Sequence, residues 1–199
     1  MDIVEIIGAL IGLAYLVLEY KANVWLWPVG IVMSLFYVVI YINGKFYADA
    51  GLQIYYICAN IYGLALWTYK KHHKTEEIES KKENFAISKT PKKRIFPIAA
   101  VALALWAGFY FILKSFTDSP VPVGDAFTTS LSIVATWMLA QKYVEQWILW
   151  IVVDVISVIL YFWKGLYPTA ILYVVYVVVA TMGYFNWRKQ MKQEQLEGL

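Results

Sequence analysis

Long apolar stretches alternate with short polar connections along the whole chain. The apolar stretches cover about residues 3–20, 25–42, 47–69, 95–113, 124–140, 143–163 and 166–187. Each is close to the roughly 20 residues that a helix needs to cross a bilayer. They are continuous and do not alternate with a period of two, which disfavours a transmembrane β-barrel. The pattern predicts an all-α integral membrane protein with seven transmembrane helices.

An internal repeat relates the second and third stretches to the sixth and seventh. A shift of 120 residues overlays them without a gap. The clearest matched pairs are Trp27 and Trp147, Tyr41 and Tyr161, Tyr47 and Tyr167, Tyr56 and Tyr176, Gly63 and Gly183, and Trp67 and Trp187. The first and fifth stretches overlay only weakly.

The repeat predicts a 3+1+3 plan. Residues 1–69 would form a first three-helix unit, residues 70–121 a polar loop and a linker helix, and residues 122–199 a second unit with a polar tail. One linking helix gives both units the same orientation in the membrane. They would then be parallel repeats, with a substrate site near the membrane midplane.

Positive charge is concentrated between the third and fourth stretches. Residues 70–94 hold nine of the 17 Lys and Arg residues. The positive-inside rule places this loop in the cytoplasm. The other loops agree, because 14 of the 17 basic residues then fall inside. We therefore expect an N-terminus outside and a C-terminus inside.

Composition excludes an ordinary soluble domain, because 61% of the residues are hydrophobic and 16% charged. The lone Cys58 excludes disulfides and cysteine-based metal sites. The N-terminus shows no cleavable signal peptide. Aromatic residues make up 18% of the chain, which suits interfacial belts or a pocket that stacks flat rings.

The stretch from Trp147 to Tyr161 carries the strongest candidate site. Asp154 is a carboxylate at mid-span, and such a group costs about 2.5–3.5 kcal/mol to insert. Trp147 and Trp150 share its helix face. We interpret the three as substrate-binding. The alternatives are a helix-locking carboxylate for Asp154 and an interfacial belt for Trp147.

The third stretch has a polar face of its own, formed by Gln53, Tyr56 and Asn60. Buried amides on this face can bind a ligand or hydrogen-bond between helices. Asp49 is interpreted as a helix-end charge, and Glu19 as a partner of a lysine or of a departing substrate. Tyr176 of the seventh stretch is a weaker substrate-binding candidate.

Catalytic and nucleotide-binding motifs are missing from the sequence. It contains no P-loop, no GxSxG, no HExxH and no paired mid-membrane carboxylates. His72 and His73 are interpreted as solvated loop residues. We therefore expect no enzyme activity, no cofactor, no metal and no nucleic-acid partner.

Three segments carry a resemblance to the PnuC-type vitamin transporters. They are WPVG at 27–30, LQIYYICANIYG at 52–63 and KYVEQWILWIVVDVISV at 142–158. The resemblance implies a SWEET-like fold of seven helices with 3+1+3 parallel repeats, a homotrimer in the bacterial inner membrane, and facilitated diffusion of an unphosphorylated vitamin. It also implies that the ligand stacks on Trp147 and Trp150 near residue 154 and bonds Gln53 and Asn60.

Residue 154 bears on which vitamin is carried. The resemblance associates nicotinamide riboside with Asn at this position, whereas this chain has Asp154. An ionised carboxylate only accepts hydrogen bonds, which suits the amine and the thiazolium of thiamine. We therefore expect thiamine, with nicotinamide riboside as the alternative. Outside transport, a vitamin-binding membrane sensor is the second class, and an integral membrane enzyme is disfavoured.

Overall fold

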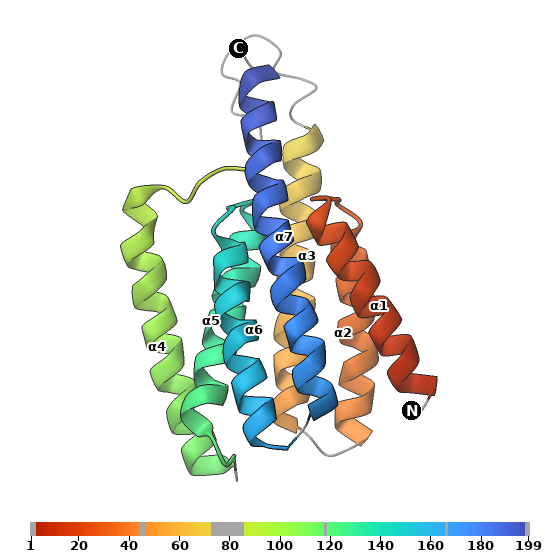
Figure 1. Ribbon diagram of the computed structural model, residues 1–199, viewed down its shortest axis with the longest axis vertical. Coiled ribbons are helices and arrows are strands. Elements are labelled where there is room, and N and C mark those ends of the chain that lie inside the picture. Colours follow the sequence, from red (N-terminus) through yellow and green to blue (C-terminus); the bar gives the residue numbers. More distant parts are fainter. Residues whose placement is uncertain (1–2, 44–46, 73–85, 118, 166, 198–199) are drawn as a thin grey trace. The chain divides into compact units, whose positions relative to one another are not determined.

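The computed structural model describes residues 3–43, 47–72, 86–117, 119–165 and 167–197. Seven α-helices lie in these ranges (Figure 1). They are α1 (Ile3–Tyr20), α2 (Leu26–Asn43), α3 (Tyr47–His72), α4 (Lys92–Phe116), α5 (Pro122–Ala140), α6 (Gln146–Trp163) and α7 (Tyr167–Glu197). The all-helical prediction is confirmed. The SWEET-like arrangement and the three-part division of the chain remain predictions.

Four described segments are long and apolar enough to cross a membrane, namely Lys92–Phe116, Pro122–Ala140, Gln146–Trp163 and Thr169–Leu196. Two shorter apolar helices are Ile11–Tyr20 and Leu26–Ile40. The exposed surfaces are rich in Ile, Val, Leu and Phe, which fits a hydrocarbon environment.

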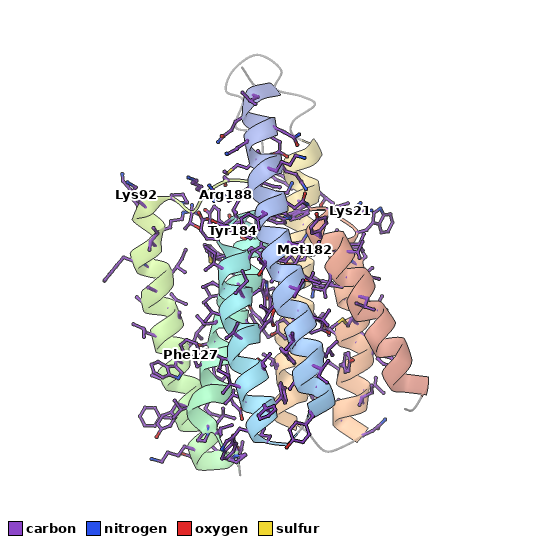
Figure 2. All side chains as sticks on the ribbon, viewed as in Figure 1. Lys21, Lys92, Phe127, Met182, Tyr184 and Arg188 are labelled. Atoms are coloured by element: carbon purple, nitrogen blue, oxygen red, sulfur yellow. The ribbon has the colours of Figure 1, made fainter. Side chains whose placement is uncertain are left out.

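The chain forms two compact units, Met1–Ala86 and Ile87–Leu199. In the first, α1 packs on α2 and α2 runs along α3. In the second, α4 packs on α5, α5 on α6, and α6 along α7. The expected linker helix α4 thus belongs to the same compact unit as α5 to α7. Its Trp106 ring meets Phe127 of α5 edge on, with ring centroids 5.7 Å apart. Figure 2 labels Phe127 among the side chains of α5.

The turns before α2 and before α6 have the same backbone structure. Ala22 and Lys142 take left-handed backbone angles, with φ of 49° and 56°. In the first unit, the Asn23 N–H donates to the Leu18 carbonyl and the Ala22 N–H to the Glu19 carbonyl. In the second, the Tyr143 N–H donates to the Met138 carbonyl and the Lys142 N–H to the Leu139 carbonyl. The N–O distances are 2.9–3.0 Å. This is the Schellman helix ending, which satisfies the last carbonyls of a helix. The 120-residue offset therefore extends to the ends of α1 and α5.

Helix α7 extends well past the expected apolar span, which ended at Trp187. Lys, Gln and Glu dominate the added turns and are good helix formers. The added turns are also anchored, because Met191 is buried and Glu194 accepts a 3.0 Å hydrogen bond from the Ile87 N–H. The polar tail expected after the seventh apolar stretch is therefore helical as far as Glu197.

The segment leading into α4 is fixed across the α5–α6 turn. Ser88 exchanges backbone hydrogen bonds with Lys142 and Val144, at 3.0 and 2.9 Å. Glu145 accepts bonds from the backbone N–H and the hydroxyl of Thr90, at 2.8 and 2.9 Å. Residues 143–145, expected inside the sixth helix, form this turn instead, and α6 begins at Gln146.

Candidate substrate-binding site

Helix α6 has two packed flanks and one exposed face. On the α5 side, a Cβ on Gly124 would fall 2.8 Å from Cδ2 of Leu160. On the α7 side, Trp147 lies against Gly183. Ile148, Val155 and Ile159 form the exposed face.

Between the two flanks runs a stripe of polar and aromatic side chains. At 100° per residue, Gln146, Trp150, Asp154 and Ser157 fall on the side of α6 opposite the exposed face. We call these four residues the α6 stripe. Gln146, Asp154 and Ser157 are buried, with exposed fractions of 0%, 6% and 6%, and Trp150 is partly buried. The helix therefore turns these polar groups away from its exposed face. The predicted contact of Trp150 and Asp154 with substrate stays a prediction.

Trp147 is held between α6 and α7. Its ring is 1% exposed and meets Trp187 edge on, with centroids 5.8 Å apart. A Cβ on Gly183 would fall 2.7 Å from its Cη2 atom. These contacts give Trp147 a packing role. They do not test its predicted contact with substrate, which stays a prediction.

Trp150 and Asp154 have different surroundings. The Nε1 donor of Trp150 is buried and has no hydrogen-bond partner among the described residues. Asp154 lies close enough to Tyr173 of α7 to interact with it electrostatically. Tyr173 in turn stacks on Tyr161 with centroids 5.1 Å apart and meets Tyr176 at 5.4 Å. The structure thus brings Asp154 and Tyr176 into one neighbourhood through Tyr173.

In the first unit, Asn60 is packed onto Gly30 of α2. Asn60 is 4% exposed, and its Nδ2 donates to the Tyr56 carbonyl at 2.7 Å. Its Oδ1 has no partner within the described ranges. A Cβ on Gly30 would collide with this oxygen. Only a glycine at position 30 leaves the space that this amide occupies.

Gln53 and Tyr56 continue the same side of α3. Gln53 lies two turns before Asn60 and is partly buried, as is Tyr56. Tyr56 interacts electrostatically with Tyr15 of α1, which also interacts with Glu19. The buried carboxylate of Glu19, at 2% exposure, belongs to this group. The side chain of Asp49 lies outside the described residues.

The two units differ where their repeats correspond. Gly30 and Asn60 of the first unit match Trp150 and Ala180 of the second, and Ser34 matches Asp154. At each of these three positions, one unit has a small residue where the other has a larger or more polar one. The predicted residues therefore form one set on α3 and one on α6 and α7. That both sets meet in one site remains a prediction.

Sequence reasoning missed Gln146. It is fully buried, and both atoms of its amide lack partners in the described part of the chain. Its repeat counterpart is the apolar Leu26. Comparing residue types across the repeat would have shown this Leu-to-Gln difference, and burial then distinguishes it from the other differences.

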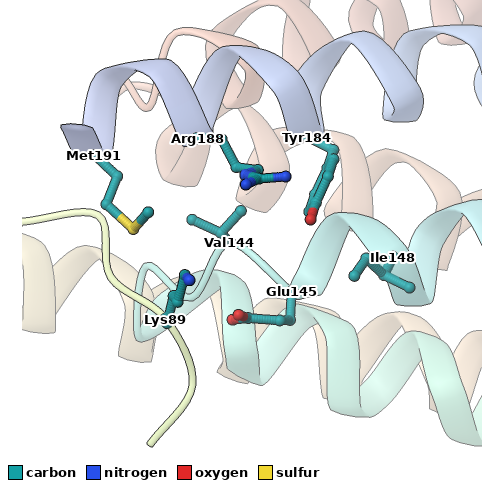
Figure 3. Close-up of a pocket in the computed structure, with 7 residues that line it drawn as sticks. All are labelled: Lys89, Val144, Glu145, Ile148, Tyr184, Arg188 and Met191. Atoms are coloured by element: carbon teal, nitrogen blue, oxygen red, sulfur yellow. The ribbon is translucent and has the colours of Figure 1, made fainter. Parts of the chain in front are cut away.

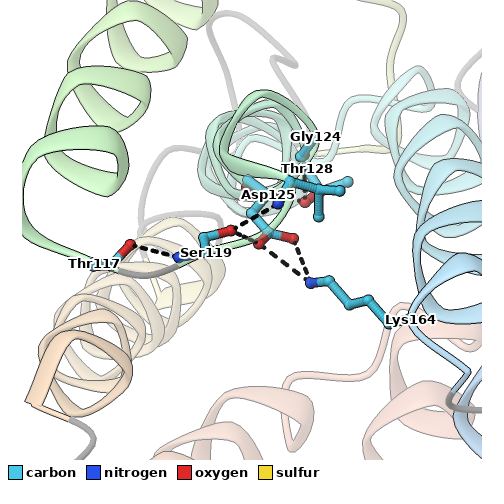
Figure 4. A network of polar contacts seen from close by, with 7 residues as sticks. Thr117, Ser119, Gly124, Asp125, Thr128 and Lys164 are labelled. Carbon is cyan, nitrogen blue, oxygen red and sulfur yellow. Dashed lines mark hydrogen bonds and ion pairs between the residues drawn. The ribbon is translucent and has the colours of Figure 1, made fainter.

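Two further polar features lie at the helix ends of the second unit. Asp125 of α5 pairs with Lys164 at 3.0 Å and accepts a 2.7 Å bond from the Ser119 hydroxyl (Figure 4). This network ties the α5 start to the α6 end.

A pocket of about 210 Å³ lies beside the α6 start and the α7 turns around Arg188 (Figure 3). It is lined by Lys89, Val144, Glu145, Ile148, Tyr184, Arg188 and Met191. None of the predicted substrate-binding residues lines it. Among the described residues, no cluster of His, Cys, Asp and Glu could hold a metal ion.

The family model described as nicotinamide mononucleotide transporter matches residues 2–189. The nicotinamide riboside transporter PnuC of Escherichia coli K12 is 24% identical, over 92% of this chain and 84% of the relative. The riboflavin/roseoflavin transporter RibM of Streptomyces davaonensis is 26% identical, over 98% and 90%. A crystal structure of the vitamin B3 transporter PnuC has a TM-score of 0.69 at 23% identity, covering 94% of this chain and 80% of that one. That structure has the same fold.

Proposed function

The chain belongs to the nicotinamide mononucleotide transporter family, and within this family of multi-pass vitamin transporters we propose that it carries nicotinamide riboside. Relatives named for this riboside match over 92% and 94% of the chain, at 24% and 27% identity. None of the relatives reported above is named for thiamine. The sequence-based preference for thiamine therefore lacks support from the relatives, and the alternative fits them better.

The α6 stripe supports an unphosphorylated, cationic aromatic substrate. A positively charged ring over Trp150 gains about 0.5–2 kcal/mol from the indole face. The buried carboxylate of Asp154 attracts such a cation in a low-dielectric site. A phosphate group would be repelled by the same carboxylate. Asp154 beside an aromatic face is the observation that carries the proposal.

Thiamine is the second candidate, because of Asp154. A carboxylate accepts hydrogen bonds from an exocyclic amine and compensates a thiazolium charge. The carboxamide of nicotinamide riboside needs an acceptor and a donor, and Asp154 supplies the acceptor alone when ionised. Riboflavin, named for a relative, is neutral and gains least from this residue.

A binding comparison tests the substrate. Purified protein is titrated with nicotinamide riboside, thiamine and riboflavin by calorimetry, with Trp150→Ala as the control that removes the stacking face. Tightest binding of nicotinamide riboside supports the proposal. Tightest binding of thiamine supports the second candidate, and binding of none contradicts both.

Uptake into proteoliposomes tests transport itself. We propose facilitated diffusion by rocking of the two helical units, without coupling to ATP or an ion gradient. Labelled vitamin should then enter the lumen down its gradient and stop at equal concentrations. Vitamin that binds and never enters would instead indicate a membrane sensor.

In the proposed orientation the protein spans the bacterial inner membrane, with its N-terminus outside the cytoplasm and its C-terminus in the cytoplasm. Its support is the excess of Lys and Arg in the loops assigned to the cytoplasm. Cys58 replaced by Ser gives a background for single cysteines added at either end. Labelling of the C-terminal cysteine by an impermeant reagent in intact cells would show that the orientation is the reverse of the proposed one. The homotrimer implied by the family remains a prediction.

A further inference from the structure

Among the buried side chains of α6, Gln146 has the most polar atoms without a hydrogen-bond partner in the described residues. Its exposed fraction is 0%, and neither Nε2 nor Oε1 has a hydrogen-bond partner among the described residues. A buried polar atom that has no hydrogen-bond partner destabilises the folded protein. Two such atoms in one side chain need an explanation beyond the fold.

The first unit shows that the fold does not require an amide here. Leu26 occupies the corresponding position at the start of α2 and is also 0% exposed. The turns before both helices have the same internal hydrogen bonds, and the turn before α6 is additionally bonded to Ser88. A leucine therefore fits the same backbone and avoids the unpaired atoms. We therefore look for the reason for Gln146 in what the second unit binds and the first does not.

The position of Gln146 connects it to the other members of the α6 stripe. Trp150 lies one turn further on, and its Nε1 is also buried without a partner among the described residues. Asp154 lies eight residues from Gln146, about 12 Å along the helix at 1.5 Å per residue. The stripe thus presents an amide, an indole and a carboxylate in a row, over the length of a small vitamin.

We propose that Gln146 binds the hydroxyl-bearing end of the transported vitamin. This inference rests on the proposed function and adds a residue that recognises the other end of the substrate. With the charged ring on Trp150 and near Asp154, the substituent of that ring extends toward Gln146. A primary amide donates and accepts, so it pairs with the alcohol groups of a ribose or a hydroxyalkyl chain. Binding would satisfy both unpaired atoms.

The test replaces Gln146 with the residue that the first unit uses. Gln146→Leu is compared with the wild type and with Gln193→Leu, the same change on the exposed end of α7. Calorimetry measures the Kd of nicotinamide riboside, thiamine and riboflavin, and a thermal melt measures stability. We expect Gln146→Leu to weaken binding by about tenfold or more, as for the loss of one or two hydrogen bonds. Its melting temperature should be equal to or above that of the wild type. The control should change neither quantity.

Two results would overturn the inference. An unchanged Kd in a stable Gln146→Leu protein would show that the substrate does not contact the amide. A clear fall in melting temperature would show that the amide has a structural partner. Either result leaves the proposed function intact if the wild type binds and transports a vitamin. A wild type that binds none of the three refutes the proposed function and this inference together.

Discussion

The indole ring of Trp147 lies directly on the backbone of Gly183, with no room for a side chain between them. A Cβ on Gly183 would fall 2.7 Å from the ring, and one on Gly63 would fall 2.5 Å from Trp27. In both units a second tryptophan completes the contact edge on, with planes 85° and 88° apart. The helix pairs α6–α7 and α2–α3 therefore pack through the same tryptophan–glycine contact, at positions 120 residues apart in the sequence.

Gly183→Ala should destabilise the second unit. The added methyl must displace a fully enclosed ring, and overpacking of this kind costs about 1–3 kcal/mol. A lower melting temperature in detergent would show the effect. Gly108→Ala in α4 is the matched control, because nothing lies within 4 Å of its Cβ position. There the gain in helix propensity, about 1 kcal/mol, should raise the melting temperature. Equal melting temperatures for the two variants would contradict the packing role.

Trp147→Ala and Trp150→Ala should separate stability from binding. Trp147 is 1% exposed between helices, so its loss leaves a large cavity and costs about 3–5 kcal/mol of folding stability. Trp150 is only partly buried, and we expect its loss chiefly to weaken vitamin binding, by about 1–3 kcal/mol of stacking energy. Melting temperature and Kd, measured on both proteins, test the contrast. A large loss of stability with Trp150→Ala and none with Trp147→Ala would reverse the two roles.

The sequence predicted the helical fold well because apolar length is a direct signal of a membrane span. It also revealed the repeat in α2–α3 and α6–α7, where tryptophan and glycine must be kept for the packing to work. It missed the repeat at the ends of α1 and α5. Ala22 and Lys142 take the same left-handed conformation, yet they share no chemistry. Backbone hydrogen bonds form that turn, so the side chains are free to differ.

The site was only partly predictable for a related reason. Asp154 was evident, because an ionisable residue is rare in an apolar span. Gln146 was not, because its position at a helix start looks like an ordinary polar boundary. Only its complete burial separates it from such a residue. Likewise, Trp147 and Trp150 share a face in the sequence, and only the contact with Gly183 shows that one of them packs against α7.

Gly30→Ala should weaken vitamin binding through Asn60. The new methyl would collide with the Asn60 Oδ1, so the amide must rotate or move away from its present position. If Asn60 binds the substrate, the Kd should rise by more than tenfold, about 1.4 kcal/mol, for the loss of an aligned hydrogen bond. Calorimetry on the purified variant measures this change.

Gly51→Ala is the matched control on α3, since nothing lies within 4 Å of its Cβ position. It should leave the Kd unchanged. A Gly30→Ala protein with wild-type affinity and a lowered melting temperature would assign Asn60 to packing between α2 and α3. A rise in Kd without a matching loss of stability would assign it to the substrate.

Asp154→Asn should change the choice between vitamins. The variant loses the charge that attracts a cation but gains an amide donor that can pair with a carboxamide oxygen. Thiamine, which uses the carboxylate for both its amine and its ring charge, should lose about 1.5–3 kcal/mol of binding energy. Nicotinamide riboside should lose less, because its carboxamide finds a new partner. Titration of both vitamins on both proteins gives the ratio of their Kd values.

The control for this change is Asp125→Asn, the same substitution at the start of α5. Asp125 pairs with Lys164 at a partly exposed site, and such a pair contributes about 0–1 kcal/mol. Its loss should alter neither Kd, since Asp125 is not part of the α6 stripe. Equal losses of both vitamins with Asp154→Asn would mean that the carboxylate supplies charge alone and does not select. A shift in favour of nicotinamide riboside would make residue 154 the position that separates the two substrates.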